Sequence, residues 1–214
     1  MPVMPCPTYV EGAVIRTLVA EDMHLIRGAL VALLGAEPDI EVVAEVERGD
    51  EIVSTALRAR PDVAVIDIYL PGMNGLDAAG VLYDRLPGCH AVILTGCGTP
   101  GTLRRAMAAH VRGFLRKDAP PSKLADSIRR VRGGQRIIDA ELAVAALDVT
   151  DNPLTNREMD VLEVAAEGAR VSEIAGRLFL ADGTVRNYLS KIVTKVGARN
   201  RVDAIRRARD AGWL

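Results

Sequence analysis

The fold is decided by residues 63–75, which read VAVIDIYLPGMNG. The first five residues form an unbroken aliphatic run that ends on a carboxylate, Asp67. Such a run is typical of a strand that is covered by helices on both faces. The Leu-Pro-Gly that follows interrupts the run and predicts a turn. The stretch therefore predicts a central strand of a parallel sheet, with Asp67 at its carboxyl end.

Comparable short apolar runs lie on both sides of this strand, at residues 15–20, 40–45, 91–95 and 113–117. Helical patterns separate them, for example the apolar stripe Leu25, Ile26, Ala29, Leu30, Leu33 and Leu34. Strand and helix alternate five times between residues 14 and 132, which predicts an α/β domain with a doubly wound, five-stranded parallel sheet. The last helix, residues 121–132, should end at the glycine pair 133–134.

The remainder of the chain shows no strand pattern. Residues 133–153 end in a polar, proline-terminated stretch and are expected to form a linker. Residues 154–214 contain four helical segments, the first opened by a capping box, Thr155 and Glu158, and the others starting near residues 171, 183 and 200. They predict a second, smaller all-α domain. Residues 1–13 are expected to be a disordered leader.

Composition narrows the class of protein. The chain has 214 residues, of which 49% are hydrophobic, and a net charge of −1. It contains no apolar run long enough to span a membrane and no signal-peptide pattern, so we expect a soluble cytoplasmic protein. Its three cysteines form no CxxC pair, which indicates neither a disulfide framework nor a zinc site. Residues 182–214 carry 8 Lys and Arg against 3 Asp and Glu, a net charge of +5 that favours a polyanionic partner.

Polar residues follow the predicted strands at the edge where ligands bind to parallel sheets. They are Glu21, Asp22, Asp67, Thr95 and Lys117. Each alone has an ordinary structural explanation, such as an acidic pair at a helix N-terminus. Together, three carboxylates favour a hard cation such as Mg²⁺, and the metal would leave one carboxylate free to attack a phosphoryl group. The best candidate for that nucleophile is Asp67, because it ends the central strand.

Residues 183–196 divide into two faces of one helix. The apolar stripe is Val185, Leu189, Ile192 and Val196, and the opposite face collects Arg186, Asn187, Ser190, Lys191, Thr194 and Lys195. A helix-turn-helix motif requires this division, with one side anchored and the other fitting the major groove of DNA. A solvated amphipathic helix in a four-helix bundle would show the same pattern, so the pattern alone leaves both interpretations open.

Residues 14–132 resemble the receiver domain of two-component systems, through residues 19–22 (VAED), 65–75 (VIDIYLPGMNG), 93–96 (ILTG) and 113–117 (GFLRK). The resemblance implies that Asp67 accepts phosphate from a sensor histidine kinase. It implies that Asp22, Asp67 and the Tyr69 carbonyl bind Mg²⁺, with Glu21 acting mainly through water. It also implies a switch formed by Thr95 and Phe114, and a phosphate contact from Lys117. The departures, Glu21 for aspartate and Leu70 for methionine, keep charge and apolar volume.

Residues 154–214 resemble the LuxR-type DNA-binding domain, through residues 154–158 (LTNRE), 173–175 (EIA), 183–190 (GTVRNYLS) and 195–201 (KVGARNR). The two halves together resemble the NarL/FixJ family, and the DesR-like subgroup within it. The resemblance implies that Arg186, Asn187 and Ser190 face bases. Phosphate contacts are implied for Thr184, Tyr188, Lys191, Lys195 and Arg201. Ala181 stands where the family usually has a capping serine, and Asp182 is the expected substitute cap.

The resemblance to a response regulator implies that phosphorylation of Asp67 promotes dimerisation and sequence-specific binding to promoter DNA. In the DesR-like subgroup, the first and fifth receiver helices form the dimer, which implicates Leu25, Leu124 and Ile128. RNA polymerase is a further candidate partner, and no membrane contact is expected. The protein would not be an enzyme beyond slow autophosphatase activity. Three alternatives remain: a regulator independent of phosphorylation, a metal-dependent phosphotransferase or phosphatase, and a protein-interaction adaptor.

Overall fold

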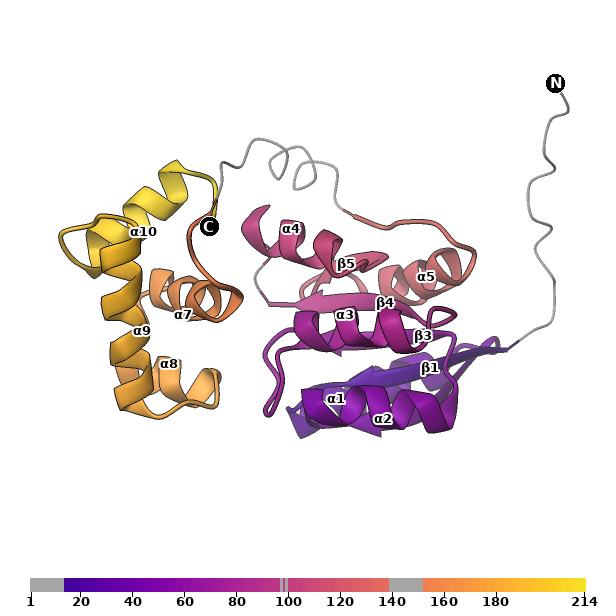
Figure 1. The fold of residues 1–214 in the computed structure, drawn as a ribbon. Coiled ribbons are helices and arrows are strands. Elements are labelled where there is room, and N and C mark those ends of the chain that lie inside the picture. Colours follow the sequence, from indigo (N-terminus) through magenta and orange to yellow (C-terminus); the bar gives the residue numbers. More distant parts are fainter. Residues whose placement is uncertain (1–13, 97, 99, 139–151) are drawn as a thin grey trace, which may run out of the picture.

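The computed structural model describes residues 14–96, 98, 100–138 and 152–214, arranged as an α/β domain followed by an all-α domain (Figure 1). The predicted leader, residues 1–13, and most of the predicted linker lie outside the described residues. Of the cysteines, Cys89 lies in the described part, where it is free and buried. No helix in the described part is long and apolar enough to cross a membrane.

The first domain is built on a five-stranded parallel sheet in the order β2-β1-β3-β4-β5. The strands are β1 (Ile15–Ala20), β2 (Ile40–Val46), β3 (Val63–Asp67), β4 (His90–Thr95) and β5 (Gly113–Arg116). Every residue of β3 is buried, because β3 lies in the middle of the sheet and helices cover both of its faces. The predicted doubly wound fold is confirmed.

Four helices connect the strands, a fifth follows β5, and together they cover the two faces of the sheet: α1 (His24–Gly35), α2 (Gly49–Ala59), α3 (Gly75–Arg85), α4 (Pro100–Ala108) and α5 (Pro121–Arg132). Buried residues of α2, α3 and α4 form one core with one face of the sheet. Buried residues of α1 and α5 form a second core with the other face. The crossovers place all five strand ends, and the residues that follow them, along one edge.

The packing of the α/β domain continues past α5 into the predicted linker. Ile137 forms an isolated bridge with Gly113 and is buried in the core on the α1 and α5 face. Its amide donates to the Arg112 carbonyl at 2.8 Å, and its carbonyl accepts from the Phe114 amide at 2.8 Å. Residues 133–138 are therefore packed against the α/β domain, which extends beyond the expected boundary at residue 132.

The all-α domain contains four helices around one core, as predicted: α7 (Asn156–Ala166), α8 (Val171–Arg177), α9 (Asp182–Lys195) and α10 (Arg201–Asp210). The capping box forms at the start of α7, where the Thr155 hydroxyl accepts from the Glu158 amide and the Glu158 carboxylate accepts from the Thr155 amide. Asp182 does not act as the substitute cap. It is the first residue of α9, whose N-cap, Ala181, provides no side-chain hydrogen bond.

Candidate functional site

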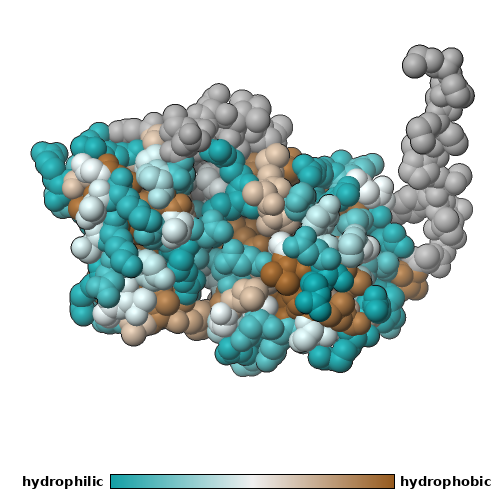
Figure 2. All heavy atoms as spheres, viewed as in Figure 1, coloured by the Kyte–Doolittle hydropathy of each residue, from teal (hydrophilic) through white to brown (hydrophobic). Residues whose placement is uncertain are grey.

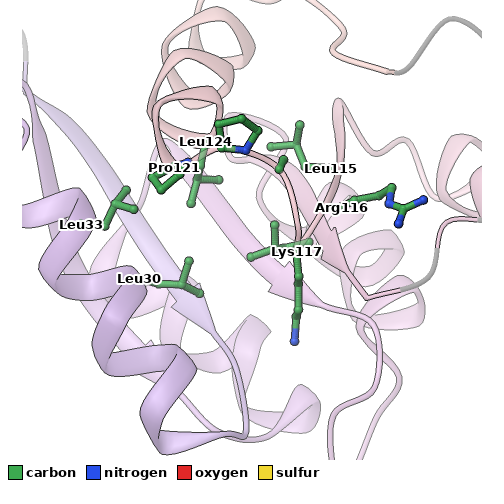
Figure 3. Close-up of a pocket in the computed structure, with 10 residues that line it drawn as sticks. Leu30, Leu33, Leu115, Arg116, Lys117, Pro121 and Leu124 are labelled. Carbon is green, nitrogen blue, oxygen red and sulfur yellow. The ribbon is translucent and has the colours of Figure 1, made fainter.

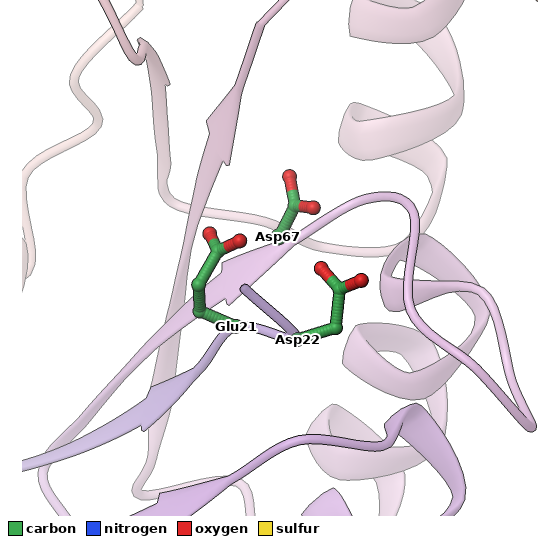
Figure 4. Close-up of side chains that lie close together, drawn as sticks. All are labelled: Glu21, Asp22 and Asp67. Atoms are coloured by element: carbon green, nitrogen blue, oxygen red, sulfur yellow. The ribbon is translucent and has the colours of Figure 1, made fainter. Parts of the chain in front are cut away.

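An acidic pocket lies at the carboxyl edge of the sheet (Figure 4). Glu21 and Asp22 follow β1, and Asp67 is the last residue of β3. One carboxylate oxygen from each lies within 4.8 Å of the others, although the residues come from two separate segments of the chain. Glu21 and Asp67 are buried and Asp22 is half-buried. Three carboxylates this close repel one another unless cations share the pocket.

Lys117 supplies one such cation from the end of β5. Its Nζ lies 2.7 Å from Glu21 Oε2 and 3.2 Å from Asp67 Oδ1. Burial opposes the charged form of this lysine, but the two carboxylates raise its pKa above the ordinary value. The lysine amide also donates to the Thr95 carbonyl at 2.7 Å, which fixes the start of the loop after β5 beside the end of β4.

Burial raises the pKa of Asp67 to about 6. Lys117 opposes that shift, whereas the neighbouring Glu21 adds to it by repulsion. Because the folded-state value exceeds the ordinary one of 3.8, ionisation of Asp67 lowers the stability of the fold progressively as the pH rises from about 3.8 to about 6, and the full cost is present above that range. An additional cation in the pocket would offset this charge and reduce that cost.

Thr95 and Phe114 lie where the resemblance places them, near the ends of β4 and β5, and both are buried. The Phe114 ring belongs to the core formed with α2, α3 and α4. The Phe114 ring therefore lies inside the core in this structure.

Two glycines shape the loop between β3 and α3. A Cβ at Gly75 would lie 1.9 Å from the Asp67 carbonyl oxygen, so no other residue fits there without moving Asp67. Gly72 adopts a φ of +81°, a left-handed conformation that favours glycine. The Asn74 side chain caps α3 by accepting from the Leu76 amide at 2.8 Å.

We expect Gly75→Ala to displace Asp67 and reduce its phosphorylation by acetyl phosphate at least 10-fold, since a misplacement of about 1 Å can cost 100-fold in rate. The measurement is intact mass over time. Gly28→Ala is the matched control, because a Cβ at Gly28 meets no atom within 4 Å. Equal rates for the two variants would show that this close approach does not position the carboxylate.

Sequence reasoning missed Arg27, which braces the acidic pocket from α1. Its guanidinium donates to the Glu21 carbonyl at 2.7 Å and to Glu47 Oε1 at 2.6 Å. Arg27 is buried, whereas Leu25 is 85% exposed. The sequence had placed Leu25 on the buried apolar stripe of this helix, so that part of the prediction is wrong. The sequence does show that Arg27 interrupts the apolar stripe. A single arginine on a helix is usually exposed to solvent, so this interruption did not indicate a buried cation.

The three predicted dimerisation residues do not share a surface. Leu25 is exposed, whereas Leu124 and Ile128 are buried in the core between α5 and the sheet. Leu124 also lines a mostly apolar cavity of about 110 Å³ between α1 and α5 (Figure 3). Leu124 and Ile128 therefore hold α5 on the sheet, because a side chain in the core cannot contact a second molecule.

The predicted polar face of α9 is exposed to solvent. Arg186, Asn187, Ser190, Lys191, Thr194 and Lys195 are all exposed. Val185 and Ile192 on the opposite side are buried, which anchors the helix to its domain. The view in Figure 2 shows a mostly hydrophilic surface on this side of the all-α domain. Thr184 and Tyr188 are half-buried at the margin of the face.

Two of the predicted phosphate-contacting cations hold the domain together. Lys195 Nζ lies 2.7 Å from the buried carboxylate of Glu158, and this contact helps to lower the pKa of Glu158 against the effect of burial. The Arg201 guanidinium donates to the Ala165 and Ala169 carbonyls at 2.7 and 2.8 Å, which secures the end of α7. Both side chains thus have structural partners that the sequence did not reveal.

An acidic pocket on a doubly wound sheet, joined to a helix-turn-helix domain with an exposed polar helix, defines a two-domain regulator. Residues 17–129 match the family described as the response regulator receiver domain, and residues 152–208 match the bacterial regulatory proteins of the luxR family. The chain belongs to the response regulators that carry a LuxR-type DNA-binding domain, and it is a DNA-binding regulator of transcription.

Known relatives extend over nearly the whole chain. It is 44% identical to the transcriptional regulatory protein DesR of Bacillus subtilis (strain 168), covering 94% of this chain and 99% of that protein. It is 43% identical to the response regulator RamR of Streptomyces coelicolor, with the same coverage. Among solved structures, the response regulator ChrA of a heme-sensing two-component system is 32% identical, with a TM-score of 0.54 over 94% of this chain and all of that one. The fold is also that of RcsB from Salmonella typhimurium, 19% identical, with a TM-score of 0.70 over 94% of this chain and all of that one.

Proposed function

We propose that Asp67 is the phosphoacceptor and that a sensor histidine kinase is the donor. The observation that carries the proposal is the cluster of three carboxylates after β1 and at the end of β3, two of which, Glu21 and Asp67, pair with Lys117. In the transfer, an Asp67 oxygen forms a bond to phosphorus while the bond from phosphorus to the kinase histidine nitrogen breaks. The electron pair of the broken bond stays on that nitrogen.

The residues of the pocket fit Mg²⁺, because they are hard oxygen donors that need a cation. Asp22, Asp67 and the Tyr69 carbonyl would hold the ion, and Glu21 would act mainly through water. When bound, Mg²⁺ supplies positive charge that offsets the incoming phosphoryl group. Lys117 is close enough to Asp67 to pair with the added phosphate oxygens, and the Thr95 hydroxyl would donate to them. We expect no turnover of a separate substrate, and at most slow hydrolysis of the aspartyl phosphate.

The proposed output is binding to promoter DNA by α9 in a phosphorylation-dependent dimer. The exposed side chains of Arg186, Asn187 and Ser190 would face bases, with Lys191 near phosphates. Lys195 and Arg201 would contribute charge from the edge of the same surface. Exposed Leu25 on α1 would contribute to the dimer surface of the receiver. Two domains would then read half-sites about one helical turn apart, and contact with RNA polymerase would follow at the promoter.

Incubation with acetyl phosphate tests the phosphoacceptor directly. With Mg²⁺ present, we expect the intact mass to rise by one phosphoryl group, peptide mapping to place it on Asp67, and size exclusion to show a dimer. With EDTA in excess over Mg²⁺, we expect uptake to fall at least 10-fold, because the carboxylates then repel the incoming group without a counter-ion. Equal uptake in EDTA would contradict the metal site. Promoter binding that never depends on phosphate would favour the phosphorylation-independent alternative.

A further inference from the structure

Asp22 is the member of the acidic pocket whose side chain is not held in place by a partner. Glu21 and Asp67 both pair with Lys117, at 2.7 and 3.2 Å. Within the described part of the chain, no hydrogen bond or ion pair reaches the Asp22 carboxylate. Figure 4 shows it extending from the chain in the same direction as the carboxylates of Glu21 and Asp67. The direction of the Asp22 carboxylate therefore depends on the backbone that carries it.

The peptide group between Glu21 and Asp22 is fixed by Arg27. The carbonyl of that peptide belongs to Glu21, and it accepts from Arg27 Nη1 at 2.7 Å. The preceding peptide is held as well, since the Glu21 amide donates to the Val46 carbonyl at 3.1 Å. A peptide carbonyl lies in one plane with the next Cα. The hydrogen bond from Arg27 thus determines the orientation in which the chain enters Asp22.

Arg27 is itself held by side chains from α1 and from the end of β2. Its Nη2 donates to Glu47 Oε1 at 2.6 Å and to His24 Nδ1 at 2.7 Å, and its Nε lies 3.5 Å from Glu45 Oε2. The Arg27 side chain is 11% exposed, whereas those of the two glutamates are about half exposed. A buried guanidinium is costly unless it is paired, and the planar fork of this one bonds Glu47 and the Glu21 carbonyl at the same time.

We propose that Arg27 is a positioning residue for Mg²⁺, because it fixes the peptide before Asp22 and so holds the Asp22 carboxylate where it can bind the ion. The inference rests on the proposed Mg²⁺ site. Arg27 lies outside the set of ligands and acts on the ion only through the backbone of Asp22. Residues that orient the ligands of a metal in this way typically contribute about 10- to 100-fold to its affinity.

Charge and positioning predict opposite effects of removing Arg27. A positive charge beside the pocket repels a divalent cation, so a role of charge alone would make Mg²⁺ bind more tightly to Arg27→Met. Positioning predicts weaker binding, because the peptide before Asp22 loses its hydrogen bond. Arg27→Lys keeps the charge but has no fork to reach Glu21 and Glu47 together. Positioning predicts weaker binding for this variant too, whereas charge alone predicts no change.

Arg129→Met is the matched control, because Arg129 is held in a similar way at the opposite edge of the sheet. Its guanidinium donates to Glu37 and Asp39, both at 2.6 Å, and these two residues precede the start of β2. Its removal breaks a comparable set of ion pairs without touching the acidic pocket. We expect Arg129→Met to lower the melting temperature and to leave the affinity for Mg²⁺ unchanged.

Affinity is measured on the full-length protein with Mn²⁺, which favours oxygen ligands as Mg²⁺ does and whose free form is counted by electron paramagnetic resonance. Competition with Mg²⁺ then gives the Kd of Mg²⁺. We expect that Kd to rise about 10-fold or more in Arg27→Met and about 3-fold or more in Arg27→Lys. With acetyl phosphate, the Mg²⁺ concentration that gives half the maximal rate of phosphorylation should rise by the same factor. The rate at saturating Mg²⁺ should change by less than about 2-fold, because the lost interaction concerns binding of the ion.

Circular dichroism first establishes that each variant is folded. Unchanged or tighter binding by folded Arg27→Met, or wild-type binding by Arg27→Lys, would overturn the proposal. If Arg27→Met does not fold, Arg27→Lys decides the matter by itself. An equal loss of affinity in Arg129→Met would also overturn it, since the affinity would then follow stability. A wild type that binds neither ion would instead defeat the proposed Mg²⁺ site, which is a different result from a wild type and variants that bind the ion equally.

Discussion

We expect Asp67→Asn to abolish phosphorylation by acetyl phosphate and to leave the protein monomeric with weak affinity for its promoter. The amide has nearly the shape of the carboxylate but is a much poorer nucleophile, so no acyl phosphate forms. We expect uptake to fall by at least 100-fold in an intact-mass assay. Promoter affinity in the presence of acetyl phosphate and Mg²⁺ should fall to the level of the untreated wild type in a gel shift.

The thermal stability of this variant shows whether it has lost only the nucleophile or has also lost its folded structure. Burial and Glu21 raise the pKa of Asp67 to about 6, so the ionised form is unfavourable in the fold above that pH. Asparagine removes this charge, and at pH 8 its melting temperature should equal or exceed that of the wild type. At pH 4, where Asp67 is mostly protonated in the fold, the gain should disappear.

Asp84→Asn is the control, since it removes an exposed carboxylate from α3, away from the pocket. It should be phosphorylated at the wild-type rate. Asp67→Asn should therefore differ from Asp84→Asn under phosphorylating conditions. If both dimerised and bound the promoter equally well, the proposal that phosphorylation of Asp67 controls dimerisation and DNA binding would be wrong.

We expect Arg186→Ala to weaken specific promoter binding by about 5- to 150-fold, or about 1–3 kcal/mol. An arginine that donates two hydrogen bonds to a guanine edge contributes about this much to discrimination between bases. Arg186 is exposed on α9, and its nearest anion, Asp182, is 3.8 Å away, which leaves the guanidinium available for DNA. We expect the loss on promoter DNA to exceed the loss on random DNA, measured by fluorescence anisotropy at one fixed salt concentration.

Two further variants serve as comparisons, one for a phosphate contact and one for a cation outside the DNA-binding surface. Lys191→Ala should weaken promoter and random DNA alike and reduce the slope of log affinity against log salt by about 1. Arg58→Ala removes an exposed cation from α2 of the receiver and should change neither affinity. If Arg186→Ala weakened binding to both DNAs equally, Arg186 would contact a phosphate. The base-contacting residues of α9 would then have to be assigned differently.

The end of the central strand was predictable because a parallel strand that is covered on both faces is apolar along its length, so the first polar residue marks its end. Residues 63–67 are all buried, and Asp67 is the point at which the run ends. The parallel topology then requires that the residues following β1, β3, β4 and β5 share an edge. The acidic pocket follows from these two facts.

Side-chain partners across the fold were not predictable, since helical periodicity gives spacing and not the rotation of a helix against its neighbours. In α1 the rotation buries Arg27 and exposes Leu25. In α5 it buries Leu124 and Ile128, which the sequence had offered to a dimer. The same limit applies to Lys195, because its partner Glu158 lies 37 residues away in the chain.

The sequence by itself determined a receiver fold with Asp67 in an acidic pocket, and a second domain with a polar helix for DNA. These features depend on local patterns and on the direction of parallel strands. Only the tertiary structure decided what Asp160 and Glu163 do, because nothing in α7 shows which face meets another domain. Their partners on the receiver, from Tyr69 to Arg105, lie at least 55 residues away. Long-range packing therefore brings the loop after Asp67 and the helix α4 into contact with the DNA-binding domain.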